Sequence, residues 1–168
     1  PNSAGDCPVQ SALLYQGAFY DVSSALGACW DPRDVDDSPR IAGSIRITNL
    51  FTAFESAVWS PAGVERLSRR LPPGQGVLVP DTYQRIGPGG HLAGQQGNQA
   101  SRLFVIGPAN DYFQVDSPIG GSFFAAAVNR QGDVVANAQT SSLVTPFLIR
   151  NRRLIDLSTV VNGYRLIY

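Results

Sequence analysis

The stretch that decides the fold is residues 41–48, which read IAGSIRIT. Ile, Gly, Ile and Ile occupy the odd positions of this stretch, while Ala, Ser, Arg and Thr occupy the even positions. Successive side chains of a β-strand point to opposite faces of the sheet, so this alternation indicates a β-strand with one apolar face. We therefore predict a half-buried strand here.

Similar short runs continue along the chain, at 53–59, 77–79, 102–106, 112–115, 123–128, 134–138, 143–149, 154–157 and 163–168. Between them lie turn sequences rich in Gly and Pro, such as GPGG at 87–90, and residues 129–133 (NRQGD) predict a hairpin loop. Strands at this spacing, without amphipathic helices between them, predict an all-β protein built as an antiparallel β-sandwich or barrel.

The whole chain of 168 residues is predicted to form one domain, and no internal repeat of fixed period is evident. Residues 1–40 are expected to be an extended or irregular N-terminal arm. Apolar residues between 14 and 26 fall at helical spacing, but the aromatic content there suits a strand; residues 60–71 fit a short helix or a strand equally well. The Gly- and Gln-rich residues 87–101 are predicted to be a long loop that orders on assembly.

Composition excludes several classes of function. The chain has 13 basic and 13 acidic residues, so its formal net charge is zero and nothing attracts the whole molecule to nucleic acid or to an anionic membrane. All the basic residues are Arg, and there is no Lys or Met. Schiff-base enzymes, Walker-type phosphate loops and Ser-x-x-Lys hydrolases all need a Lys, so these classes are excluded.

Candidate catalytic groups are few. His91 is the only histidine and lies in the Gly-rich loop, where we expect a solvated side chain rather than a general base. The chain has no Gly-x-Ser-x-Gly elbow, no dinucleotide-binding fingerprint and no His-Glu-x-x-His motif, and Glu55 and Glu65 are its only glutamates. We therefore expect a protein that is not an enzyme, with no cofactor and no small-molecule substrate.

Cys7 and Cys29 form either one disulfide, closing a loop of about twenty residues, or two free thiols. Their spacing matches no zinc motif, so no metal site is predicted from them. A separate cluster of carboxylates forms either a solvated turn or a candidate calcium site, and its members are Asp31, Asp34, Asp36 and Asp37.

Two groups of arginines are candidate interface residues, because the planar guanidinium pairs with carboxylates in a bidentate manner. They are Arg66, Arg69 and Arg70, and Arg150, Arg152 and Arg153. Ordinary surface charge is the alternative, and without interleaved aromatics specific nucleic-acid binding is a poor fit. Trp30 and Trp59 suit a sandwich core better than a sugar-binding face.

One further pattern carries a family resemblance. Residues 43–49 (GSIRITN) and 71–79 (LPPGQGVLV), with Val58-Trp59 and Arg69-Arg70 between them, resemble an arrangement in small β-domains of phage virion proteins. In its length, β pattern and lack of Lys and Met, the whole chain resembles the small single jelly-roll capsid proteins of tailless, membrane-containing icosahedral phages of thermophilic bacteria. That resemblance implies a jelly roll on the particle surface, packed against copies of itself and a second capsid protein, above an internal membrane.

The sequence therefore predicts a viral structural protein that self-associates into a virion shell through loops and edge strands. Phe51, Phe54 and Phe147 are candidate interface residues. Residues 1–5 lack the basic and apolar segments of a signal peptide, so we expect synthesis in the host cytoplasm and residence in the virion. The alternative is a secreted or surface-displayed binding module, a lectin or fibre head, with a Cys7–Cys29 disulfide.

Overall fold

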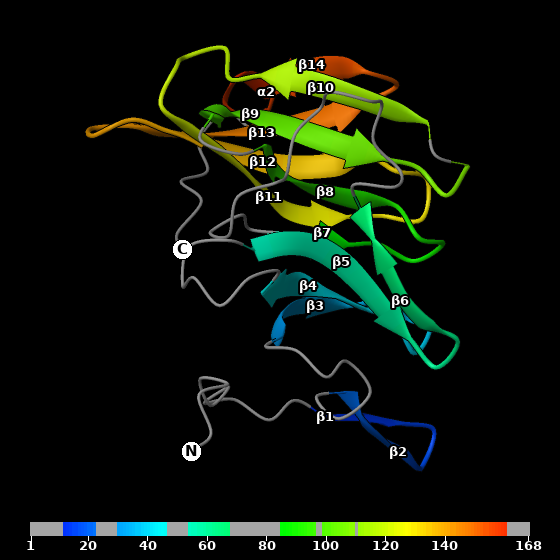
Figure 1. Ribbon diagram of the computed structural model, residues 1–168. Helices are drawn as coiled ribbons and strands as arrows, with labels where there is room; N and C mark the ends of the chain where they lie inside the picture. Colours follow the sequence, from blue (N-terminus) through cyan, green and yellow to red (C-terminus); the bar gives the residue numbers. More distant parts are fainter. Residues whose placement is uncertain are drawn as a thin grey trace, which may run out of the picture.

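The computed structural model describes residues 12–22, 30–46, 54–67, 85–96, 99–109 and 111–160, and most of these residues lie in β-strands (Figure 1). The strands are β1 (Ala12–Tyr15), β2 (Ala18–Asp21), β3 (Trp30–Val35), β4 (Ile41–Arg46), β5 (Phe54–Ser60), β6 (Gly63–Arg66), β7 (Arg85–Ile86), β8 (Leu92–Gln96), β9 (Gln99–Ile106), β10 (Tyr112–Asp116), β11 (Ser122–Val128), β12 (Val134–Gln139), β13 (Val144–Arg150) and β14 (Arg153–Asp156). A single helical turn, α2 (Leu157–Val160), follows β14.

These strands form three four-stranded antiparallel sheets and one hairpin. We name them the first sheet (β3–β6), the second sheet (β7–β10), the third sheet (β11–β14) and the N-terminal hairpin (β1–β2). The predicted antiparallel all-β class is confirmed. The jelly roll is not, because each described strand pairs only with its neighbours in sequence, whereas a jelly roll contains Greek keys.

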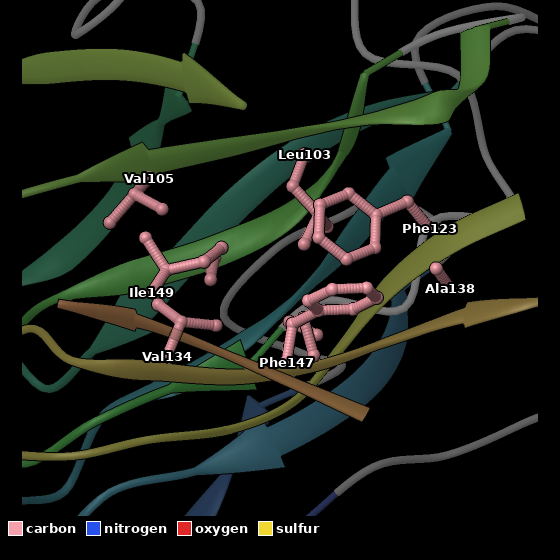
Figure 2. Packing of buried hydrophobic residues seen from close by; sticks show 10 residues of the cluster. Leu103, Val105, Phe123, Val134, Ala138, Phe147 and Ile149 are labelled. Atoms are coloured by element: carbon pink, nitrogen blue, oxygen red, sulfur yellow. The ribbon is translucent and has the colours of Figure 1, made fainter. Parts of the chain in front are cut away.

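The second and third sheets pack face to face (Figure 2). Phe123 of β11 and Phe147 of β13 meet edge to face, with ring centroids 6.1 Å apart and an interplanar angle of 89°. Around them lie the buried side chains of the facing strands, among them Leu103, Val105, Val134, Ala138 and Ile149. This cluster is the largest of the described residues, and it holds the two sheets together.

The opposite face of the second sheet packs against the first sheet. Phe104 and Ile106 of β9 are fully buried there, against Ala42 of β4 and Val58 of β5. The other face of the first sheet is covered in turn by the N-terminal hairpin, where Tyr20 meets Trp59 edge to face at 5.8 Å. The described part of the chain is therefore a stack of β-layers, with the hairpin at the bottom of Figure 1.

Burial on two faces changes the meaning of the alternating pattern in β4. Ile41 and Ile45 face the N-terminal hairpin, as the alternation predicts, but Ala42 and Ser44 on the other face are also buried. The prediction of a half-buried strand is wrong, because the first sheet has a layer on each side. Trp30 and Trp59 are buried, which confirms their predicted core role.

Three segments differ from expectation or resolve an ambiguity. The predicted long loop at 87–101 contains β8 and the start of β9, whose backbones pair with each other. The predicted N-terminal arm contains the hairpin and β3, which pairs with β4. Between 60 and 71, the strand alternative is correct for β6. The strands predicted at 77–79 and 163–168, together with Cys7 and Cys29, lie outside the described residues.

Each of the three four-stranded sheets has a five-residue connection between its first two strands. The backbone N–H of the first turn residue donates to the carbonyl of the fifth, from Asp36 to Arg40 (3.3 Å), from Gly87 to His91 (2.8 Å) and from Asn129 to Asp133 (3.0 Å). The three turns have unrelated sequences, DDSPR, GPGGH and NRQGD. The three connections therefore share their length and this hydrogen bond but not their backbone conformation, because φ is positive at Gly89 and Gly90 in the second sheet, at Gly132 in the third, and at no residue of the first-sheet turn.

Candidate functional site

The turns of the second and third sheets gather at one end of the stack, at the right in Figure 1, and enclose a cavity of about 200 Å³. Each sheet contributes two turns to the wall, because antiparallel meanders place alternate connections at the same end. The lining includes His91, Asp111, Phe113, Asp133, Asn151 and Arg152. We call this the turn cavity.

Close backbone packing shapes two walls of the turn cavity. Gly132 has a left-handed φ of +80°, and a Cβ there would come within 2.6 Å of the imidazole of His91. A Cβ on Gly107 would come within 1.9 Å of the Asp111 carboxylate. Glycine at position 132 therefore lets its turn lie against the His91 ring of the neighbouring sheet, and glycine at position 107 leaves room for the Asp111 carboxylate of its own turn.

Asn129 organises the β11–β12 turn. Its Oδ1 accepts hydrogen bonds from the backbone N–H groups of Gln131 (3.0 Å) and Asp133 (2.9 Å), and its Nδ2 donates to Asp133 Oδ2 (3.0 Å). Asn and Asp commonly stabilise turns in this way. The turn therefore holds the Asp133 carboxylate at a defined position in the cavity wall.

Asp133 also accepts from Arg150 on the neighbouring strand, at 3.0 Å from Nε and 2.9 Å from a terminal guanidinium nitrogen. The hydrogen bond from Arg150 lowers the pKa of Asp133 below its ordinary value; desolvation opposes the shift, and Asn129 adds to it. Charge-assisted pairing of this kind favours the ionised carboxylate. The pairing with Arg150 therefore stabilises the ionised form of Asp133.

We expect Arg150→Gln to raise the pKa of Asp133 toward the ordinary aspartate value of about 3.9. Because the pKa is lowered by folding, the stability contributed by this pair is fully present above about pH 4 and is lost as the pH falls through the folded-state value. Carboxyl-carbon NMR titration of the two proteins measures the shift. An identical Asp133 titration in both would show that Arg150 does not stabilise the charge.

Arg152 has an unusual backbone conformation. Asn151 and Arg152 form the two-residue β13–β14 turn with φ values of +52° and +61°. Such turns favour Gly at the second position, and a left-handed residue with a Cβ costs about 1–2 kcal/mol. The turn sets the Arg152 guanidinium over the ring of Phe113, 5.4 Å from its centroid. A strained backbone at the edge of a cavity is a reason to consider function.

His91 is part of the cavity wall, so the prediction of a solvated loop histidine is wrong. The side chain is partly buried, and within the described structure its Nδ1 is buried without a hydrogen-bond partner. Sequence reasoning missed this position because residues 87–91 looked like part of a long loop. The turn between two strands instead fixes His91 against Gly132 of the next sheet.

The four aspartates of the candidate calcium site do not converge on one point. Asp31 pairs with Arg33 at 2.5 Å, Asp36 with Arg40, and Asp37 with Arg130 at 2.9 Å, while Asp34 accepts from the backbone N–H of Ile86 at 3.0 Å. Over the described ranges, no three acidic, His or Cys side chains lie close enough to hold a metal ion. Asp34 and Asp37 instead connect the first sheet to the other two.

The structure places the predicted interface residues in different environments. Phe147 is buried in the core, so its predicted exposure is wrong: it alternates with the outward residues of β13. Arg66 pairs with the buried Glu55 at 3.1 Å. Arg150 of β13 and Arg153 of the edge strand β14 are cross-strand partners. Phe51, Arg69, Arg70 and the side chain of Phe54 lie outside the described part of the structure.

Both ends of the stack carry exposed apolar side chains that sequence reasoning did not single out. The outer face of the third sheet has a cross-strand row of Ala127, Val135, Leu148 and Ile155, in which Val135 and Ile155 are 38% and 37% exposed. On the outer face of the N-terminal hairpin, the paired residues Leu14 and Phe19 are each 72% exposed. We call these surfaces the third-sheet face and the hairpin face.

A hollow of about 400 Å³ lies beside the hairpin face, lined by residues that include Phe19, Trp59 and Val64. Among the described residues, no helix has the length and apolarity needed to cross a membrane. In comparisons with protein families, with curated proteins and with solved structures, nothing matches this chain.

Proposed function

We propose that the protein is a structural protein that works by associating with copies of itself. In this proposal the third-sheet face of one copy packs against the hairpin face of the next. The observation that carries it is the presence of exposed apolar residues at both outer ends of a stack whose internal layers all meet through apolar faces. The same chemistry that joins the layers inside one chain is thus available between chains.

Exposed apolar side chains scattered singly are ordinary, but a row across neighbouring strands is a contiguous surface. Val135, Leu148 and Ile155 lie directly opposite one another on three adjacent strands. Covering them removes apolar area from water, which stabilises association by about 25 cal/mol for each Å². The hollow beside Phe19 gives the hairpin end a concave surface that such side chains can enter.

Arg153 lies beside the third-sheet face, on β14, the edge strand of the third sheet. Of the predicted arginine interface, Arg153 is the residue that fits this proposal.

Head-to-tail contact produces either a closed ring or continued growth, depending on the angle between copies. We further propose that the assembly is the virion shell that the family resemblance implies. A shell requires growth into large particles. Density-gradient fractionation of the native source tests that part. Co-sedimentation of many copies with large particles is the expected result, whereas a chain found only in the soluble fraction would contradict a virion role.

Self-association is tested with single charged substitutions. We expect Ile155→Asp on the third-sheet face, or Phe19→Asp on the hairpin face, to weaken association by about 100-fold, because each places a carboxylate in an apolar contact. The matched control is Ile119→Asp, whose side chain is 36% exposed in the turn before β11 and belongs to neither face. Sedimentation-velocity ultracentrifugation over a concentration series measures the effect.

Mixing the two variants identifies the geometry. Ile155→Asp keeps an intact hairpin face and Phe19→Asp keeps an intact third-sheet face, so the mixture should form 1:1 dimers while each variant alone stays monomeric. A dimer of Phe19→Asp alone would instead indicate a symmetric contact between two third-sheet faces. A wild-type protein that remains monomeric at about 100 µM would overturn the proposed self-association.

A further inference from the structure

We propose that the turn cavity is a binding site for one small, neutral, polyhydroxylated molecule of monosaccharide size. The site lies at the turn end of the second and third sheets, whereas self-association is assigned to the two outer faces of the stack. The two proposals therefore rest on different residues, and either can fail alone.

The size of the cavity limits the ligand. Pockets for drug-sized molecules enclose about 300–1,000 Å³. The turn cavity, at about 200 Å³, is smaller and suits a single compact ring rather than a chain of several rings or an extended peptide.

The charges around the cavity balance. Asp133 is paired with Arg150, which leaves the carboxylate of Asp111 and the guanidinium of Arg152 as the other two ionised groups of the lining. An anion would be attracted by Arg152 and repelled by Asp111. A cation would be attracted by Asp111 and repelled by Arg152. A neutral ligand escapes both repulsions.

The polar groups of the lining include both donors and acceptors. Arg152 only donates, the carboxylates only accept, and the side-chain amides of Gln131 and Asn151 do both. A hydroxyl group also donates and accepts, so several hydroxyls on one ring can satisfy groups of both kinds. This mixture distinguishes a polyhydroxylated ligand from an apolar one.

His91 shapes one wall of the turn cavity. Its ring lies against Gly132, where an added Cβ would come within 2.6 Å of Cδ2 and 2.8 Å of Nε2. Its Nδ1 is buried from solvent, so this nitrogen does not face the cavity. The histidine therefore limits the space for a ligand, and the hydrogen-bonding groups of the site come from the other lining residues.

The site is also preorganised. The left-handed backbone at Arg152 and the ring of Phe113 beneath its guanidinium fix the position of the main donor. Hydrogen bonds between the first and fifth turn residues hold Asp111 and His91, at 2.8 Å in each turn. Binding groups on rigid turns lose less conformational entropy when a ligand arrives.

The test is saturation-transfer NMR of the purified chain with glucose, galactose, mannose, N-acetylglucosamine and myo-inositol, followed by calorimetric titration of any that binds. We expect at least one of them to bind, and Asp111→Ala and Arg152→Gly each to weaken that binding at least tenfold. Arg152→Gly removes the donor and suits the left-handed backbone, so loss of folding does not explain its effect. The control is Arg33→Ala, an exposed arginine of the first sheet outside the cavity.

Three results would overturn the proposal. One is the absence of saturation transfer to any of the five compounds. Another is binding that persists unchanged in both cavity variants, which would place the ligand elsewhere. The third is tighter binding of inorganic phosphate than of any sugar, lost in Arg152→Gly, which would make the cavity an anion site. If binding is found as expected while the chain stays monomeric, the cavity proposal stands and self-association fails.

Discussion

Replacing Phe123 with Ala is expected to lower the free energy of unfolding by about 3–5 kcal/mol. The Phe123 side chain is fully buried between the second and third sheets and meets Phe147 edge to face. Removing the ring loses its transfer free energy and the aromatic contact, and it leaves a cavity that two stacked sheets cannot fill by a local shift. Urea denaturation followed by tryptophan fluorescence and circular dichroism measures the loss.

Phe124→Ala is the matched control, because it removes the same side chain from the adjacent position. Phe124 points to the other face of β11 and is only partly buried, so we expect a loss of about 1–2 kcal/mol. Equal losses for the two variants would contradict the assignment of the core to the inner face of the third sheet.

Replacing Gly121 with Ala is expected to destabilise the protein by about 3–5 kcal/mol through a different mechanism. Gly121 precedes β11 with φ at +70°, and a Cβ there would lie 2.1 Å from the carbonyl oxygen of Gln139. That oxygen belongs to the β12 backbone, and Gln139 is itself the cross-strand partner of Ser122. The oxygen therefore cannot rotate away as a side chain can. The cost therefore combines left-handed strain with displacement of the strand.

Gly120→Ala separates these two contributions. Gly120 has nearly the same φ, +71°, but a Cβ there would meet nothing within 4 Å. Only the left-handed strain of about 1–2 kcal/mol remains. Thermal unfolding of the two variants compares them directly, and a Gly121→Ala protein no less stable than Gly120→Ala would show that the close approach to Gln139 is absent.

Local sequence patterns predicted most of the individual strands. Residues 123–128 and 134–138 are short, mainly apolar runs on either side of the turn sequence NRQGD, and they correspond to β11 and β12 joined by the predicted hairpin turn. Prediction failed at 87–101, where Gly94 and Gln95 occupy a strand in spite of low β-propensity. Their backbone groups pair with Phe104 and Leu103, and these partners, rather than local preference, stabilise β8.

The candidate site was less predictable than the fold. His91, Asp111 and Arg152 lie on three different turns, and only the packing of two sheets brings them to one cavity. The two-residue loop Asn151-Arg152 has both residues at positive φ. Asn at the first position is typical of such a loop, but Arg152 stands where Gly is favoured, so the sequence indicates the turn only in part. Without the pairing of Arg150 with Arg153, however, nothing located that loop.

The sequence by itself determined the all-β class and the approximate positions of many strands, because alternation and turn residues act over a few neighbouring positions. It also excluded lysine-dependent chemistry, since that depends on composition alone. The tertiary structure alone decided that the sheets are meanders stacked in layers, that Phe147 is buried and that both outer ends are apolar. These properties depend on which faces meet, and alternation shows that a strand has two faces without showing what covers each of them.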